Sequence, residues 1–418
     1  MTDAHTRPDS VSVNGRSYAW PTRPTVVICV DGSEPAYIEE AVAAGVMPFT
    51  ASMLEHGADL RADCVVPSFT NPNNLSIVTG VPPAVHGICG NYFLDPVSGA
   101  EVMMNDPELL RCETLLAAFA RAGARVAVVT AKDKLRALLG RGLPFGPGQA
   151  VCFSAEKADQ AQAQTHGIDD VPALVGMAVP AVYSAALSEF VLAAGARLLE
   201  ERHWDLMYLS TTDYIQHKHA PGTPVANAFY AMLDRYLAKL DALGATVAVT
   251  ADHGMKPKHD ADGRPRVIYL QSLLDERLGA GQARVILPIT DPYVIHHGAL
   301  GSFAVVYLGP GVDAAGVQAQ IAAIDGIDEV LPRDAACRRF DLPPDREGDL
   351  IVISAADQTL GTRPENHDLT QLAEPLRSHG GTSEQRVPLL LNRPCGHEPG
   401  QRALRNFDAF HLALNRIA

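Results

Sequence analysis

Three acidic residues stand just beyond short apolar runs that are widely separated in the chain. They are Asp31 after residues 26–30, Asp213 after 206–209 and Asp252 after 247–250. If these runs are strands of one parallel sheet, their carboxyl ends share the edge at which such sheets bind ligands. Carboxylates crowded together repel one another unless cations neutralise them. The pattern therefore predicts a metal site shared by three distant acids.

Three histidines accompany these acids. His217 lies four residues after Asp213, so the two side chains face the same way on a helical turn. His253 directly follows Asp252, and His379 precedes two glycines. Oxygen and nitrogen ligands of this kind suit Zn²⁺ better than Mg²⁺ or Ca²⁺. At roughly three ligands per ion, the set indicates two metals about 4 Å apart, an arrangement that handles phosphoryl transfer.

A hydroxyl and two lysines are further candidates at the same edge. Thr70 lies in the polar loop 67–74 before an expected helix at 75–80. A helix N-terminus favours anions, although a threonine there commonly serves only as an N-cap. Lys132 and Lys134 follow an expected strand at 125–130. They could receive an anionic substrate, or they could be the solvated start of a helix. Five other histidines are weaker candidates: His86, His219, His259, His296 and His297.

The elements that must position these residues alternate between strand and helix. Strands are expected at 25–30, 61–66, 125–130, 150–153, 205–210, 245–250 and 387–391, and helices at 35–44, 48–56, 113–122, 180–200, 224–242 and 406–415. A hairpin is expected around Asn14-Gly15. Such alternation predicts an α/β fold with a doubly wound, mostly parallel sheet and helices on both faces.

The regular alternation of strands and helices ends after Met255. Shorter mixed segments, with strands expected at 267–270, 304–308 and 349–353 and a helix at 314–323, predict a smaller inserted α+β domain. We therefore expect a catalytic core made of residues 1–257 and 376–418 and a cap made of residues 258–375.

Bulk composition excludes several functions. The net charge of −14 and the lack of basic runs argue against nucleic-acid binding. Seven scattered cysteines without a C-x-x-C motif indicate neither a disulfide framework nor a thiolate zinc site. The polar N-terminus and the absence of a long apolar run predict a cytoplasmic protein that does not contact membranes.

Taken in order, these motifs resemble the alkaline phosphatase superfamily, in its nucleotide pyrophosphatase/phosphodiesterase-like branch. They are D-G at 31, P-S-F-T-N-P-N-N at 67, H-G-I at 86, D-x-x-x-H at 213, A-D-H-G-M at 251 and H-G-G at 379. The resemblance implies two zinc ions per subunit, one held by Asp31, Thr70, Asp252 and His253 and the other by Asp213, His217 and His379. It also implies the inserted cap and, as a family-level expectation, a homodimer. The C-x-P-S-R motif of sulfatases is absent, so the nucleophile falls on Thr70.

Within that branch the chain resembles the phosphonoacetate hydrolase family, which cleaves a carbon–phosphorus bond to give acetate and phosphate. Asn91 matches the position that receives the phosphonyl oxygen, and Lys132 and Lys134 match those that receive the substrate carboxylate. The resemblance implies attack by the Thr70 hydroxyl, a phosphothreonine and its hydrolysis by water. A carbanion leaves readily only if the adjacent carboxylate can take its charge as an enolate, which cations at that carboxylate would favour.

Two other functions remain open. A phosphodiesterase or nucleotide pyrophosphatase of the same fold would need an aromatic slot for a base, which Tyr92, Phe93 and Tyr214 could supply. A non-enzymatic zinc-dependent protein that binds phosphate or phosphonate would keep the ligands but would have no need of the Thr70 hydroxyl.

Overall fold

A computed structural model of the chain describes residues 7–95, 97–146, 148–289, 299–370, 372–396 and 402–417. Its centre is a seven-stranded sheet in the order β4-β19-β10-β3-β9-β7-β8. The strands are β4 (Ala58–Asp63), β19 (Arg386–Leu391), β10 (Thr246–Thr250), β3 (Thr25–Cys29), β9 (Leu206–Ser210), β7 (Val126–Thr130) and β8 (Ala150–Ser154). From β10 to β8 every pairing is parallel, whereas β19 runs antiparallel to both β10 and β4.

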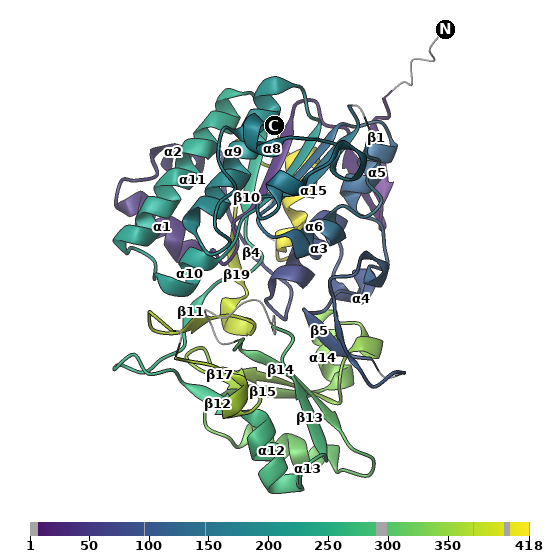
Figure 1. Ribbon diagram of the computed structural model, residues 1–418, viewed down its shortest axis with the longest axis vertical. Helices are drawn as coiled ribbons and strands as arrows, with labels where there is room; N and C mark the ends of the chain where they lie inside the picture. The colour runs from purple at the N-terminus through teal and green to yellow at the C-terminus, as the bar shows by residue number, and fades with distance from the viewer. Residues whose placement is uncertain are drawn as a thin grey trace.

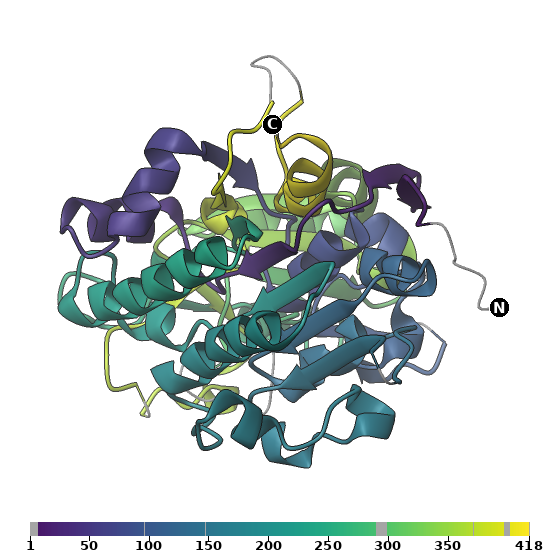
Figure 2. The same cartoon turned by 90° about the horizontal axis from the view of Figure 1, so that it is seen from above.

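Helices cover both faces of this sheet, as Figures 1 and 2 show. One apolar layer contains α1 (Pro35–Ala43), α2 (Pro48–His56), α9 (Ala185–Glu201) and α11 (Pro224–Ala242). The other contains α3 (Thr70–Thr79), α5 (Leu115–Arg121), α6 (Asp133–Leu139) and α15 (Ala409–Asn415). Every residue of β3, β7, β8, β9 and β10 is buried, because a parallel sheet covered on both faces needs continuous apolar strands. The predicted fold class is confirmed.

The element bounds differ from expectation in a few places. The hairpin forms as β1 (Ser10–Val13) and β2 (Arg16–Ala19) around Asn14-Gly15. The strand expected at 61–66 is β4, which begins three residues earlier than predicted. The prediction missed its start because the first residues of β4 include Asp59 and Arg61, which interrupt the apolar pattern. The helix expected at 75–80 already begins at Thr70. Among the described helices, none combines the length and the apolar character that a membrane span requires.

A second sheet lies in the lower part of Figure 1. Its four antiparallel strands follow the order β13-β14-β16-β15: β13 (Ala283–Ile286), β14 (Phe303–Leu308), β16 (Leu350–Ser354) and β15 (Ile327–Pro332). It carries α12 (Leu270–Leu278), α13 (Ala314–Ala322) and α14 (Arg333–Phe340), and β12 (Val267–Tyr269) pairs beside it with β17 (Thr359–Gly361). The expected strands and helix of this segment are present, whereas β13, β15, β17, α12 and α14 were not foreseen. We retain residues 258–375 as a proposed cap.

The chain leaves and re-enters the core through one narrow ribbon. β11 (Lys256–Pro257) pairs antiparallel with β18 (Arg377–Ser378). Beside the ribbon, the fully buried Lys258 places its Nζ 2.9 Å from Oε1 of Glu384 and donates to the carbonyl of Ala356. Removing either partner of a buried ion pair leaves an uncompensated charge and is strongly destabilising. The Lys258–Glu384 pair therefore stabilises the contact between the segment that leaves the core and the segment that returns to it.

A buried carboxyl between the core and the second sheet should make stability depend on pH. Burial raises the pKa of Glu347 to about 8, and its Oε2 has no hydrogen-bond partner among the described residues. Between its ordinary pKa of 4.5 and 8, the unfolded chain releases this proton before the folded protein does, so stability falls as pH rises through that window. Glu347→Gln should therefore increase the free energy of unfolding by about 3 kcal/mol at pH 7 but not at pH 4.

Urea unfolding of both proteins at the two pH values measures this difference. An equal effect of the substitution at pH 4 and pH 7 would show that folding does not raise the pKa of Glu347.

Candidate active site

The strands that carry the candidate acids end side by side. In the sheet register Thr250 pairs with Cys29, Cys29 pairs with Ser210, and Ser210 pairs with Thr130. The residues that follow these ends therefore share one edge of the sheet. They are Asp252 after β10, Asp31 after β3, Asp213 after β9 and Lys132 after β7.

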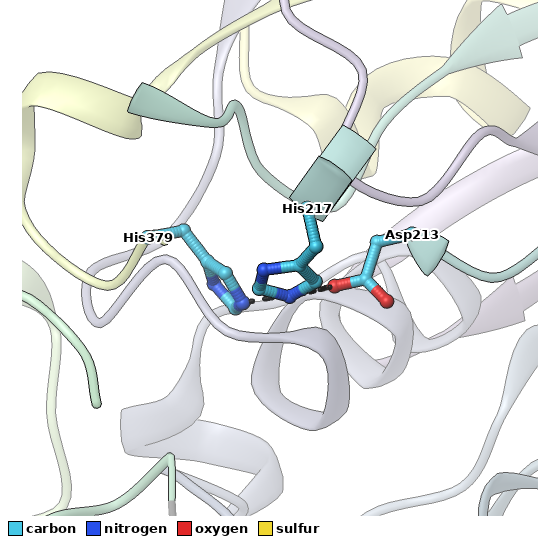
Figure 3. Close-up of side chains that lie close together, drawn as sticks. All are labelled: Asp213, His217 and His379. Carbon is cyan, nitrogen blue, oxygen red and sulfur yellow. Dashed lines mark ion pairs between the residues drawn. The ribbon is translucent and has the colours of Figure 1, made fainter. Parts of the chain in front are cut away.

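Asp213, His217 and His379 form one cluster that could hold a metal ion (Figure 3). Asp213 directly precedes α10 (Tyr214–Lys218), and its Oδ2 lies 2.8 Å from Nε2 of His217, one helical turn on. His379 arrives from the loop after β18 and places its Nε2 3.8 Å from the same oxygen. All three side chains are buried.

A second cluster contains Asp31, His253 and again Asp213. Nε2 of His253 lies 3.3 Å from Oδ1 of Asp31 and 3.9 Å from Oδ2 of Asp252. The His253 and His379 rings stack with their centroids 3.5 Å apart, so the two clusters are adjacent. Asp213 belongs to both clusters, whereas the resemblance assigned it to one ion. Asp252 stands slightly outside, where its Oδ1 accepts from the backbone N–H groups of Gly32 and His253.

The three histidines are oriented by main-chain carbonyls. Nδ1 of each ring contacts a carbonyl oxygen: His217 that of Arg377 at 2.8 Å, His253 that of Gly254 at 2.9 Å and His379 that of Ser68 at 2.8 Å. A carbonyl can only accept, so Nδ1 of each ring carries a proton, and this contact turns Nε2 toward the acids. Metal-binding histidines are held in this way.

Electrostatics at the site also favour a cation. Burial raises the pKa of Asp31 well above its ordinary value, and the nearby Asp213 and Asp252 raise it further. Burial would lower the pKa of His253, but the facing Asp252 and Asp31 carboxylates raise it to about 10. Oδ1 of Asp31 is a buried acceptor without a hydrogen-bond donor among the described residues. A divalent metal would satisfy that oxygen and offset the repulsion, so the donor set fits a metal ion.

Thr70 is the first residue of α3 and not its N-cap. The N-cap is Phe69, whose side chain cannot accept a hydrogen bond. The interpretation of Thr70 as a simple cap is therefore wrong, since its hydroxyl is not used by the helix. Its Oγ1 lies 3.5 Å from Nε2 of His253, beside the second cluster. Asn73 secures the loop instead, accepting from the N–H of Val65 and donating to the carbonyl of Phe69.

One cavity brings the candidate reactive groups together. Asp31, Asp213 and His379 line it, together with Thr70, Asn91, Lys132 and Lys134. Nδ2 of Asn91 donates to the carbonyl of Ile289 at 3.3 Å, which anchors it where the core meets the second sheet. Two acids and the His379 imidazole thus face the same space as two ammonium groups, with the Thr70 hydroxyl beside them.

Sequence reasoning missed Asn74, which supports several of these groups. Its Nδ2 donates to Oδ2 of Asp252 at 3.1 Å and to the carbonyl of Thr70 at 3.0 Å. Its Oδ1 accepts from the hydroxyls of Tyr208 at 2.7 Å and Ser210 at 2.8 Å. Asn74 is one helical turn after Thr70, so helical spacing was the available signal.

The weaker candidates that the structure describes stay outside the clusters. Burial lowers the pKa of His86 to about 3, and its ring bonds to Ser76 and to the N–H of Ile88, which is a structural role. His219 and His259 line neither cluster nor cavity. His296 and His297 lie outside the described residues.

Of the three aromatic residues considered for a base-binding slot, Tyr92 lines the cavity. Phe93 is buried under the Arg346 guanidinium, and the Tyr214 ring contacts Lys218. The three do not form a common slot.

This fold and site define the class of protein. A family model described as type I phosphodiesterase / nucleotide pyrophosphatase matches residues 25–382. The chain belongs to this family, a branch of the alkaline phosphatase superfamily, and is a hydrolytic enzyme. Murine ectonucleotide pyrophosphatase / phosphodiesterase 5 shares the fold, with a TM-score of 0.61 at 17% identity over 93% of each chain.

Much greater similarity exists to one particular hydrolase. The crystal structure of phosphonoacetate hydrolase from Sinorhizobium meliloti 1021 in complex with phosphonoacetate matches with a TM-score of 0.95 and 62% identity, over 98% of this chain and 99% of that chain. A complex of the same protein with phosphonoformate matches equally well.

Shorter stretches match two further proteins. Phosphonoacetate hydrolase of Penicillium oxalicum is 62% identical over 32 residues, 7% of this chain and 44% of that sequence. An uncharacterized pyrophosphatase/phosphodiesterase of Schizosaccharomyces pombe is 36% identical over 86 residues, 20% of this chain and 16% of that protein. The matched stretches thus span less than half the length of these two relatives.

Proposed function

We propose that this protein hydrolyses the carbon–phosphorus bond of phosphonoacetate to give acetate and phosphate. The observation that carries the proposal is the single cavity in which Thr70, two buried acids, His379 and two lysines face one another. A substrate with a phosphonate at one end and a carboxylate at the other matches this division of charge. The near full-length similarity to the Sinorhizobium meliloti enzyme supports it.

The two clusters would hold two zinc ions in this proposal. Asp31, Asp252, His253 and the Thr70 hydroxyl would contribute to one, and Asp213, His217 and His379 to the other. Bound zinc would supply Lewis acidity, lowering the pKa of a hydroxyl and neutralising the oxygens on phosphorus. The main-chain carbonyls on each Nδ1 keep the three rings facing inward before any ion arrives.

Thr70 is the proposed nucleophile. Its Oγ1 attacks phosphorus, a Thr70–phosphate bond forms, and the carbon–phosphorus bond breaks with its electron pair on carbon. That carbanion is held as the enolate of acetate and takes up a proton, equivalent to the one lost by the hydroxyl, to give acetate. Water then attacks the phosphothreonine, releasing phosphate and restoring the hydroxyl.

Asn91, Lys132 and Lys134 bind the two ends of the substrate in this mechanism. The Asn91 amide donates to a phosphonyl oxygen. The two lysines meet the carboxylate, where negative charge grows as the bond to carbon breaks, so their effect is larger in the transition state than in the ground state.

A comparison of two substrates tests the proposed function. Purified zinc-loaded protein should release phosphate from phosphonoacetate with a kcat/KM at least about 100-fold above that for nitrophenol release from a nitrophenyl phosphodiester, a gap of about 3 kcal/mol in transition-state binding. A faster reaction with the diester would favour the phosphodiesterase alternative. Binding of phosphonoacetate without turnover of either compound would favour the non-enzymatic one.

Substitution of Lys132 should weaken recognition of the carboxylate. We expect Lys132→Met to lower kcat/KM for phosphonoacetate by about 100-fold, because a charge-assisted contact that strengthens in the transition state is lost. Turnover of methylphosphonate esters, which lack the carboxylate, should change less than about threefold. Lys157→Met is the matched control, because Lys157 pairs with Asp133 nearby but does not line this cavity. Equal losses with both substrates would contradict the assignment.

A further inference from the structure

A second hollow, of about 180 Å³, lies away from the Thr70 cavity. Three arginines line it, Arg16, Arg402 and Arg416, together with Asp408 and His411. Figure 2 shows its surroundings, where the purple N-terminal hairpin approaches the yellow C-terminal helix α15. Segments from opposite ends of the chain therefore build this site.

Positive charge exceeds negative charge in the hollow. Oδ1 of Asp408 lies 2.8 Å from Nη2 of Arg16 and 2.6 Å from Nη2 of Arg402. Burial opposes ionisation of Asp408, but Arg402 and Arg16 hold the pKa of this carboxyl below its usual value. Three guanidinium groups around one carboxylate leave a surplus of 3 − 1 = 2 positive charges among the lining residues, in a chain of net charge −14.

His411 adds an unused polar atom. Its Nδ1 is buried and has no hydrogen-bond partner among the described residues. Burial and the Arg16 charge lower the pKa of this imidazole, so it is neutral at pH 7. This atom is screened from the hollow, so the arginines and not His411 supply its hydrogen-bond donors.

We propose that this hollow binds a phosphate-class oxyanion at a site separate from the Thr70 cavity. Guanidinium groups present paired N–H donors that match the oxygens of phosphate, and a dianion would neutralise the surplus of two charges. The only apolar side chains on its described wall are Leu404 and Leu412, which leaves little surface for a base or another large apolar group.

The hollow is far enough from the active site for the two binding events to be separated. Nη1 of Arg16 donates to the carbonyl of Gly80 at 3.0 Å, and Gly80 is the C-cap of α3. Thr70 is at the other end of this helix, which places the two sites about 15 Å apart by helical rise. The proposal does not depend on which substrate Thr70 attacks.

Calorimetric titration of the zinc-loaded protein with inorganic phosphate at low ionic strength tests the proposal. We expect two bound phosphates per chain, one in each site. Arg402→Met/Arg416→Met should weaken one event at least tenfold and leave kcat/KM for phosphonoacetate unchanged. Asn91→Ala removes the proposed donor to the phosphonyl oxygen in the Thr70 cavity and should weaken only the other event. Arg16 is left in place because it also holds the end of α3.

A matched pair of substitutions controls for charge alone. Arg235→Met/Arg338→Met removes two exposed arginines elsewhere and should leave both events intact. Sulfate should compete with phosphate at the arginine-lined hollow if the hollow recognises oxyanions in general. Phosphonoacetate should compete with phosphate there if the natural ligand is a phosphonate. The proposal would be overturned if the Arg402→Met/Arg416→Met protein bound two phosphates with unchanged affinity. It would also be overturned if the Arg235→Met/Arg338→Met control lost the same phosphate-binding step.

Discussion

Replacing Thr70 with alanine should lower kcat for phosphate release from phosphonoacetate by at least about 1,000-fold. The reason is local. Thr70 opens α3 without capping it, so its hydroxyl is free of any helix role and stands 3.5 Å from His253. Removing the oxygen deletes the proposed nucleophile and leaves the helix with better propensity at that position. Single-turnover kinetics with radiolabelled phosphonoacetate would measure the loss.

Two further measurements separate a catalytic role from a structural one. Thr70→Ser keeps the oxygen and should retain activity within about tenfold, with a transient phosphorylated protein detectable after acid quenching. Thr70→Ala should unfold at a temperature close to that of the parent and retain most of its zinc. Activity of the alanine variant within tenfold of the parent would assign the attack to water instead.

Removal of metal should have an effect of similar size. Dialysis against a chelator is expected to reduce activity by at least about 1,000-fold, and Zn²⁺ should restore it. Without a cation, the buried carboxylates repel one another and Asp31 and His253 take up protons, as their raised pKa values indicate. The metal-free protein should therefore also unfold at a lower temperature than the loaded protein.

The substitution Asp213→Asn tests whether this carboxylate is a ligand of both metal ions or of only one. Because Asp213 belongs to both clusters, losing its charge should lower the zinc content at both sites, whereas His217→Asn should affect mainly one. Asp59→Asn, on an exposed part of β4, is the matched control for charge. Metal analysis after desalting gives the stoichiometry. Full zinc content in Asp213→Asn would mean that neither ion relies on this carboxylate.

The parallel part of the fold could be predicted because its strands leave a plain signal. β3, β9 and β10 are buried on both faces, which demands unbroken apolar runs ending in polar residues. β4 was placed three residues too late because it has exposed and half-buried positions and contains charged residues. The edge strands β13 and β15 of the second sheet escaped prediction for the same reason, since both contain charged residues at exposed positions.

The groups in the cavity were accessible to sequence reasoning because each acid marks the end of a strand. The supporting contacts were not. Asn74 acts through Tyr208 and Ser210, which are more than 130 positions away in the chain and meet it only across the packed sheet. The carbonyls that orient the histidines belong to the backbone, and residue type carries no record of them. The double membership of Asp213 likewise follows from distances alone.

The paired ribbon β11–β18 has a consequence for how such proteins can diversify. Lys256 and Ser378 are partners in this ribbon, so the stretch between them begins and ends at neighbouring points. Its length and fold can change without altering the path of the chain on either side. The same closeness also constrains the protein, because His253 lies just before β11 and His379 lies just after β18. A rotation of the intervening residues about this ribbon would displace the His253 and His379 rings relative to the buried acids. Large movements of that part of the chain would therefore change the geometry of the candidate active site.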